Sequence, residues 1–175
     1  FDRNASRGTS ESPVVCPMDP DPRTKVSWAR ACRVRVPTAL ARSAFLRTLA
    51  ERGLSGRVSV LWTDDEGIRE LNARFRGLDE TTDVLTFPGP DFPGAPLGDV
   101  AISLETARRQ AAARGIPPEV ETAYLAIHAA LHLAGLRDET DEEREEMQAE
   151  MARLAALFGL PVDPEWTSLH GEGLQ

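Results

Sequence analysis

Alternation of apolar and polar residues predicts four strands in this chain, and apolar residues at helical spacing predict five helices. In the segment 31–36, Cys32, Val34 and Val36 lie on one side of an extended chain and two arginines on the other. The predicted strands are 31–36, 58–62, 83–87 and 97–103. The predicted helices are 38–53, 64–75, 103–114, 118–133 and 141–158, and several of them end at a glycine, where a left-handed residue is common.

The order of these elements indicates the fold class and the domain boundaries. Strands come early and helices late, so we expect an α+β fold, a single layer arrangement in which a small mixed sheet of about four strands packs with about five helices. The strands 83–87 and 97–103 should form a hairpin with a long, turn-rich connection. We expect a disordered N-terminal extension at 1–22, one folded domain at 23–160 and a C-terminal tail at 161–175.

Charge is distributed unevenly along the chain. The 175 residues carry a formal net charge of −8. Residues 23–76 hold twelve Lys or Arg against five Asp or Glu, while residues 138–150 hold eight acids against one arginine. Such a polarised molecule can present a basic face to phosphate, although the same charges can simply solvate helix surfaces. No segment is long and apolar enough to span a membrane, and the first residues lack a signal-peptide pattern. We therefore expect a cytoplasmic protein without a membrane partner.

Two histidines in the fourth predicted helix are the strongest chemical signal. His128 and His132 are four residues apart, so their rings project from one face of a helix and can converge on one metal ion. Gly135 then allows the chain to turn back, which brings Asp138 within reach as a third ligand. Two imidazoles and a carboxylate leave one position open for water, as in catalytic zinc sites. The alternative is that the two histidines are neighbours by coincidence of packing.

Other polar and aromatic residues have two possible roles each. Asp83 and Asp99 either orient metal ligands or cap turns, and we favour the turns. Trp62 and Phe87 either stack on nucleic-acid bases or belong to the core, and their place on alternating strands favours the core. Ala129 follows the first histidine, where zinc peptidases carry a glutamate as general base, which argues against ordinary peptidase chemistry.

With these residues in view, the chain resembles the YbeY family of bacterial rRNA maturation endoribonucleases. The family motif His-Gly-x-Leu-His-Leu-x-Gly-Tyr-Asp-His is similar to residues 128–138. A second block, Leu-Asn followed by an arginine and Thr-Asp-Val-Leu-Ser-Phe-Pro, is similar to Leu71, Asn72, Arg76 and 82–88. The family's Leu-Gly-Asp block matches 97–99. The three blocks occur in the expected order between about residues 34 and 157.

This resemblance implies a single-strand-specific, metal-dependent endoribonuclease that acts in maturation of the 16S rRNA 3′ end and in ribosome quality control. It implies Arg76 as the catalytic arginine and His128, His132 and Asp138 as ligands of one Zn²⁺. RNA in the 16S rRNA precursor and the ribosome are the implied partners, with ribosomal proteins or an assembly GTPase as further ones. Asp138 stands where most members have a third histidine, which makes the site harder and leaves the choice of metal open.

Two other functions fit the same ligand spacing. One is a metal-dependent peptide or amide hydrolase, which would have to work without an acid at Ala129. The other is a ribosome-associated binding module in which the metal ion is structural. Its partner-binding face would be the acidic stretch 138–150, although we favour a solvated helix start as the explanation of those charges.

Overall fold

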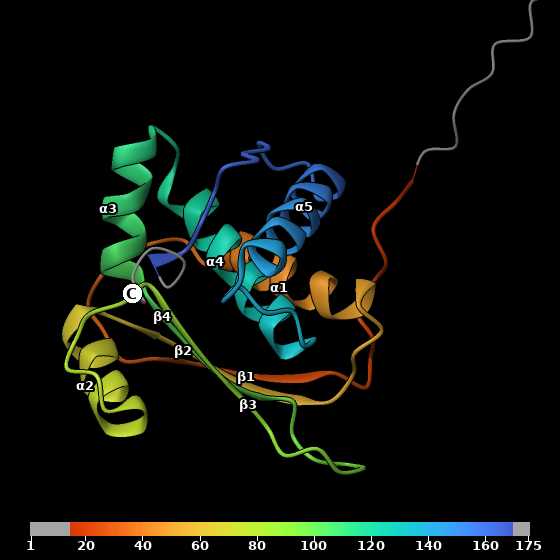
Figure 1. The fold of residues 1–175 in the computed structure, drawn as a ribbon, viewed down its shortest axis with the longest axis horizontal. Helices are drawn as coiled ribbons and strands as arrows, with labels where there is room; N and C mark the ends of the chain where they lie inside the picture. The colour runs from red at the N-terminus through yellow and green to blue at the C-terminus, as the bar shows by residue number, and fades with distance from the viewer. Residues whose placement is uncertain (1–14, 170–175) are drawn as a thin grey trace, which may run out of the picture.

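The computed structural model describes residues 15–169 and contains one four-stranded sheet with strand order β1-β2-β4-β3. Strands β1, β2 and β4 run parallel, and β3 pairs antiparallel with β4 at the edge of the sheet. Figure 1 shows this sheet beneath α1, α4 and α5. The predicted α+β class with a mixed sheet is confirmed, as is the hairpin. The strands are β1 Lys25–Arg30, β2 Arg57–Thr63, β3 Val84–Pro88 and β4 Gly98–Ser103.

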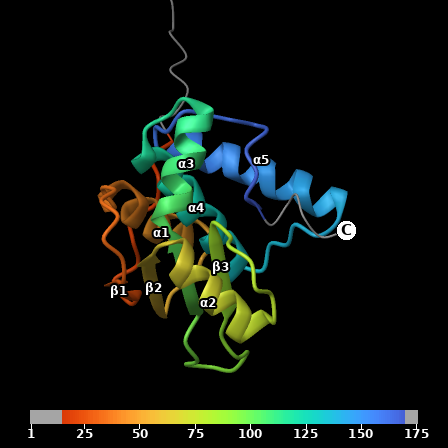
Figure 2. The same cartoon turned by 90° about the vertical axis from the view of Figure 1, so that its left-hand side faces the viewer.

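Five helices cover both faces of the sheet. Helix α2 packs on one face, where Ile68 contacts Leu85 and Ala101 in a small apolar cluster. The other helices lie on the opposite face over the larger core, with α4 against the sheet (Figure 2). Every residue of α4 from Val120 to Leu131 is buried. The helices are α1 Ala39–Glu51, α2 Asp65–Arg76, α3 Leu104–Arg114, α4 Pro118–Leu133 and α5 Asp141–Leu157.

The predicted strand 31–36 is wrong, because the strand lies just before it. β1 pairs with β2 from Lys25 opposite Arg57 to Arg30 opposite Trp62. The amide of Ala31 then donates to the Trp62 carbonyl at 2.9 Å, the last such bond before β2 ends. The next residues keep their alternating exposure but have no strand beside them. The alternation of apolar and polar residues therefore identified an extended segment, but it could not show where the neighbouring strand ends.

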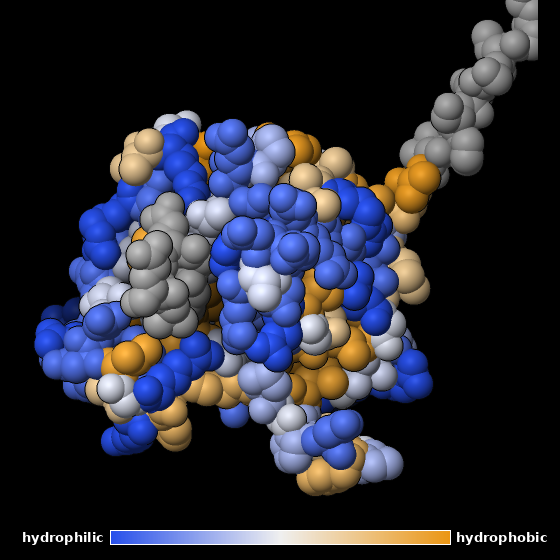
Figure 3. Space-filling view, in the orientation of Figure 1, coloured by the Kyte–Doolittle hydropathy of each residue, from blue (hydrophilic) through white to orange (hydrophobic). Residues whose placement is uncertain are grey.

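Both ends of the described chain rest on the domain. Of the expected extension 1–22, residues 1–14 lie outside the described residues, while the amide of Met18 donates to Glu51 Oε1 at 2.7 Å. Of the expected tail 161–175, residues 161–169 run back over the helices, with Trp166 and Ser168 buried. Hydrophilic side chains cover much of the face shown in Figure 3, including the region over α5. Within residues 15–169, no helix has the length and apolar character needed to cross a membrane.

Candidate metal centre

Helix α4 places two histidine nitrogens side by side near its C-terminal end. His128 and His132 are one turn apart, and their rings stand at 86° with centroids 4.5 Å apart. Their Nε2 atoms are separated by 2.9 Å. His128 is 3% exposed and belongs to the core side of the helix, whereas His132 is partly open to solvent. The two Nε2 atoms therefore face one point, with a buried ring on one side and a partly accessible ring on the other.

The turn after α4 returns Asp138 to the same spot. Gly135 adopts a φ of +94°, a left-handed conformation that suits glycine, and the amide of Leu136 closes the helix by donating to Leu131 O. Asp138 Oδ2 then lies 3.4 Å from His128 Nε2 and 3.5 Å from His132 Nε2. The three ligand atoms fall within 4.8 Å of one another.

These separations fit a metal ion held by all three groups. Ligand atoms about 2.0–2.1 Å from a tetrahedral Zn²⁺ are roughly 3.3 Å from each other. Both nitrogen-to-oxygen distances are close to that value, and the nitrogen pair is somewhat closer. The structure thus brings together the three residues proposed from spacing, and among residues 15–169 no fourth His, Cys, Asp or Glu joins this group.

The hydrogen bonds of His132 favour the tautomer that a ligand needs. His132 Nδ1 is 2.9 Å from the carbonyl oxygen of Leu136, which can only accept a hydrogen bond. The proton therefore resides on Nδ1, and the lone pair of Nε2 faces the site. A backbone carbonyl cannot be recognised as such a partner from the sequence, although Leu136 stands where the family motif has tyrosine.

Electrostatics set the protonation states that metal binding requires. The adjoining imidazoles of His128 and then His132 hold the pKa of the Asp138 carboxyl well below its usual range. Removal from water lowers the pKa of His128, which outweighs the opposing effect of Asp138. The site accordingly offers a carboxylate and a neutral buried imidazole, and few protons have to leave before an ion can bind.

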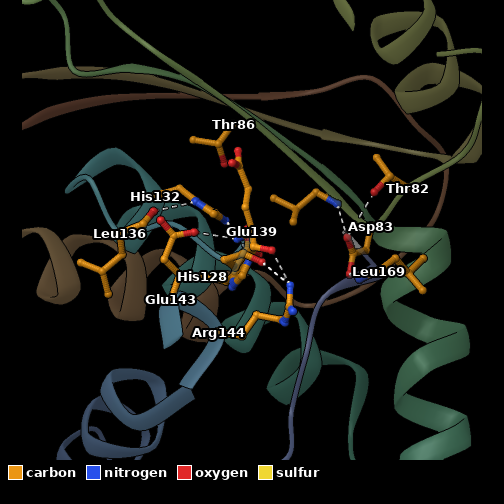
Figure 4. Close-up of polar contacts among 12 residues, drawn as sticks. Thr82, Asp83, Thr86, His128, His132, Leu136, Glu139, Glu143, Arg144 and Leu169 are labelled. Atoms are coloured by element: carbon orange, nitrogen blue, oxygen red, sulfur yellow. Dashed lines mark hydrogen bonds and ion pairs between the residues drawn. The ribbon is translucent and has the colours of Figure 1, made fainter. Parts of the chain in front are cut away.

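The first turn of α5 fixes the loop that carries Asp138. The Glu143 carboxylate accepts from the amides of Glu139 and Thr140, both at 3.0 Å, while Thr140 Oγ1 accepts from the Glu143 amide. Arg144 donates to the carbonyl oxygens of Asp138 and Glu139 at 3.2 and 2.8 Å, as Figure 4 shows for Glu139. Part of the acidic stretch 138–150 therefore caps a helix and holds a loop in place.

Arg76 contacts β3 and none of the three proposed ligands directly. It is the last residue of α2, and its Nη2 donates to the carbonyl oxygen of Thr86 in β3 at 2.9 Å. The guanidinium also lies 5.4 Å from the centroid of the Phe87 ring. None of the contacts found for Arg76 among residues 15–169 involves His128, His132 or Asp138.

The other polar and aromatic residues considered from the sequence have contacts or positions that suit a structural role. Asp83 is buried, and its carboxylate accepts from the amides of Val84 and Leu169 at 2.8 and 2.9 Å. Asp99 is exposed on β4. Trp62 is completely buried in the core, which prevents stacking on a base, and Phe87 packs against Phe75 with centroids 5.5 Å apart. Two buried residues next to His128, Trp166 and Ser168, were not anticipated, because no local pattern marks them.

Comparisons with known proteins agree on one family. The sequence model described as Endoribonuclease YbeY matches residues 31–159. A protein named Endoribonuclease YbeY from Rhodopseudomonas palustris strain BisB5 is 37% identical over 93% of this chain and 88% of its own length. One of the same name from Bradyrhizobium sp. strain BTAi1 is 39% identical over 85% of this chain and 95% of its own.

Other matches are shorter or more distant. The Endoribonuclease YbeY of Rhodopseudomonas palustris strain CGA009 is 50% identical, over 61% of this chain and 59% of its own length. A solution structure of a Thermotoga maritima protein shares the fold with a TM-score of 0.52, at 23% identity over 75% of this chain and 90% of that one. On the extent of the family match and of the longer relatives, this chain belongs to the YbeY family of endoribonucleases.

Proposed function

We propose that this protein hydrolyses phosphodiester bonds in single-stranded RNA with one Zn²⁺ held by His128, His132 and Asp138. The observation that carries the proposal is the convergence of three ligand atoms from α4 and the following turn, within 4.8 Å of one another. Bound there, a zinc ion supplies Lewis acidity and a water that is acidic enough to react near neutral pH. Two imidazoles, one carboxylate and an open position are the donor set of a catalytic rather than a structural zinc site.

The chain's own residues suit a phosphodiester better than an amide. Ala129 is buried and has no acid to offer beside His128, which removes the general base that zinc peptidases use. Arg76 is exposed, and one of its guanidinium nitrogens donates to Thr86 O. The rest of the guanidinium can bind two phosphate oxygens in the fork geometry that lysine lacks. We assign Arg76 the binding of the substrate phosphate.

Charge on the surface supports a polyanionic substrate. Arg30, Arg33 and Arg35 line an open groove of about 940 Å³ where the chain leaves β1. Arg33 and Arg35 are exposed and form no ion pair within residues 15–169. Family membership then points to the 16S rRNA precursor near its 3′ end as the substrate, and to a role in ribosome quality control in the cytoplasm. Ribosomal proteins or an assembly GTPase are the corresponding protein partners.

The deciding experiment measures metal content and RNA cleavage together. Wild type, His132→Ala, Asp138→Asn and Asp138→His are purified, analysed by mass spectrometry for metal, and incubated with single-stranded and duplex rRNA fragments. We expect about one equivalent of zinc in the wild type and little in His132→Ala and Asp138→Asn. Asp138→His should bind zinc, because an imidazole nitrogen then replaces the carboxylate as third ligand. Cleavage of the single strand should follow the metal content.

Arg76→Ala is tested against Arg74→Ala, an exposed arginine two residues earlier on the same helix. We expect Arg76→Ala to lose at least tenfold in kcat/KM for RNA with full zinc content, and Arg74→Ala to stay near wild type. Equal activity of the two variants would refute the role of Arg76. Zinc binding that raises the melting temperature without cleavage in any state would favour the structural metal, and chelator-sensitive cleavage of casein would favour the amide hydrolase.

A further inference from the structure

The segment Asp163–Leu169, here called the C-terminal strap, packs against the His128 ring through Trp166. Trp166 is 2% exposed and contacts the His128 ring edge-on, with centroids 5.5 Å apart at 60°. The same indole stacks on Tyr124 at 5.6 Å and 17°. Tyr124 and His128 lie one turn apart on α4, so the indole covers two successive turns of the helix that carries the histidines.

Three anchors hold the strap in place. The indole Nε1 of Trp166 donates to the buried Glu121 carboxylate, at 3.1 and 3.2 Å from its two oxygens. Arg114 Nη1 pairs with the same carboxylate at 2.9 and 3.0 Å, and its Nη2 donates to Thr167 O at 3.0 Å. The amide of Leu169 donates to Asp83 Oδ2 at 2.9 Å (Figure 4). The strap is thereby fixed to α3, α4 and the start of β3 at points outside the three ligands.

The two histidines differ in the partner of their second nitrogen. His132 Nδ1 donates to a backbone carbonyl, whereas His128 Nδ1 is buried without a hydrogen-bond partner among the described residues. With Nε2 turned to the ion, a neutral His128 carries its proton on Nδ1. Histidine ligands nearly always donate that proton to a carboxylate, a carbonyl or a water. A buried N–H without a partner would cost roughly 1–3 kcal/mol.

A second buried polar atom borders the same space. Ser168 Oγ has no hydrogen-bond partner among the described residues, and Ser168 is 2% exposed. Ser168 and His128 line one small cavity of about 20 Å³, together with the proposed ligand Asp138 and with Trp166, Gln148 and Arg144. A water molecule needs about 10–15 Å³ and two to four polar partners. The cavity therefore has the volume and the polar lining for one ordered water between an imidazole and a hydroxyl.

We propose that the C-terminal strap positions His128 for metal binding, with Ser168 accepting the Nδ1 proton of His128 through one ordered water and Trp166 holding the ring plane. This inference rests on the proposed metal site. It assigns Ser168 and Trp166 as positioning residues, since neither contacts the ion or the reacting atoms. The strap acts by restricting the imidazole to the tautomer and orientation that point Nε2 at Asp138 and His132.

The test compares zinc affinity in wild type, Ser168→Ala and the control Ser59→Ala, which removes an exposed hydroxyl from β2. The dissociation constant is measured by competition with a chromogenic chelator, and the melting temperature is measured on the metal-free proteins. We expect Ser168→Ala to raise the dissociation constant about tenfold, the lower end for residues that support ligands. Ser59→Ala should match wild type, and both metal-free variants should melt near the wild-type temperature.

A second readout follows the proton itself. In zinc-loaded protein with ¹⁵N-labelled histidine, the Nδ1–H of His128 should give a resonance protected from solvent exchange, and Ser168→Ala should shift it and speed its exchange. An unchanged affinity and an unchanged resonance in Ser168→Ala would overturn the role of the strap while leaving the metal site intact. A wild type that takes up no zinc would overturn the metal site and this inference with it.

Discussion

Replacing Trp166 with phenylalanine isolates what the anchor between the strap and Glu121 contributes to stability. The substitution keeps an aromatic ring against Tyr124 and His128 and removes the indole N–H that donates to the Glu121 carboxylate. Glu121 is completely buried and keeps Arg114 as its remaining charged partner. Burial raises the pKa of Glu121 despite that arginine, so the carboxylate is already costly to ionise in this position.

The expected magnitude follows from two losses. A hydrogen bond to a charged group contributes about 1.5–3 kcal/mol. The smaller ring leaves roughly 40 Å³ less side chain in the core, which costs about 1 kcal/mol at ~24 cal/mol per Å³. The free energy of unfolding should therefore fall by about 3 kcal/mol. For a chain of this size the melting temperature should drop by roughly 6–12 °C, at 2–4 °C per kcal/mol.

Trp62→Phe is the matched control, because Trp62 is equally buried and its Nε1 has no hydrogen-bond partner among the described residues. It loses the same ring volume without losing a hydrogen bond, so a cost of about 1 kcal/mol or less is expected. Urea unfolding of both variants and wild type, monitored by circular dichroism, measures the difference. If Trp166→Phe is no less stable than Trp62→Phe, the strap does not rest on Glu121 in solution and the reasoning fails.

Two further predictions concern Gly98 in β4 and Asp65 in α2. Gly98→Ala should abolish soluble expression or lower the free energy of unfolding in urea by more than about 3 kcal/mol. Gly98 has a φ of +149°, and a Cβ there would lie 2.8 Å from Leu133 Cδ2 and even closer to Phe87 O. Asp65→Asn should cost about 1–2 kcal/mol at pH 7. Burial raises the pKa of Asp65, but hydrogen bonds from Arg109 and two hydroxyls outweigh burial, and the pKa is lowered overall. The carboxylate therefore stabilises the wild type at neutral pH, and this stabilisation is lost as pH falls below about 4. The unfolding curves of the two proteins should converge there.

Local patterns were sufficient for most elements of the fold. The helix over 118–133 and the glycine stop after it follow from apolar spacing and from a backbone conformation that glycine adopts easily. The helix start at Ser103 was also predicted, and the Ser103 side chain accepts from the amide of Thr106 at 3.2 Å. Such features depend on residues within one or two turns of each other, and so they can be recognised before any tertiary contact is known.

The first strand could not be placed in the same way. Exposure alternates along residues 31–36 as in a strand, yet β1 is Lys25–Arg30. β1 stops there because β2, its pairing partner, ends just after the residue opposite Arg30. A strand is defined by its partner, and here the partner is about thirty residues away in the chain. The family's Leu-Gly-Asp block shows the same dependence, since the close approach of β3 and Leu133 to Gly98 adds a tertiary reason, beside its backbone conformation, for the missing side chain.

The sequence by itself determined the family, the fold class and the chemistry of the proposed site, since two histidines on one helical face, a glycine turn and an aspartate are local features. Tertiary structure alone decided what supports them. Trp166 and Ser168 are brought beside His128 by chain reversal and by anchors at Glu121 and Asp83. These contacts join residues up to 86 positions apart, and packing over such separations leaves no period in the sequence.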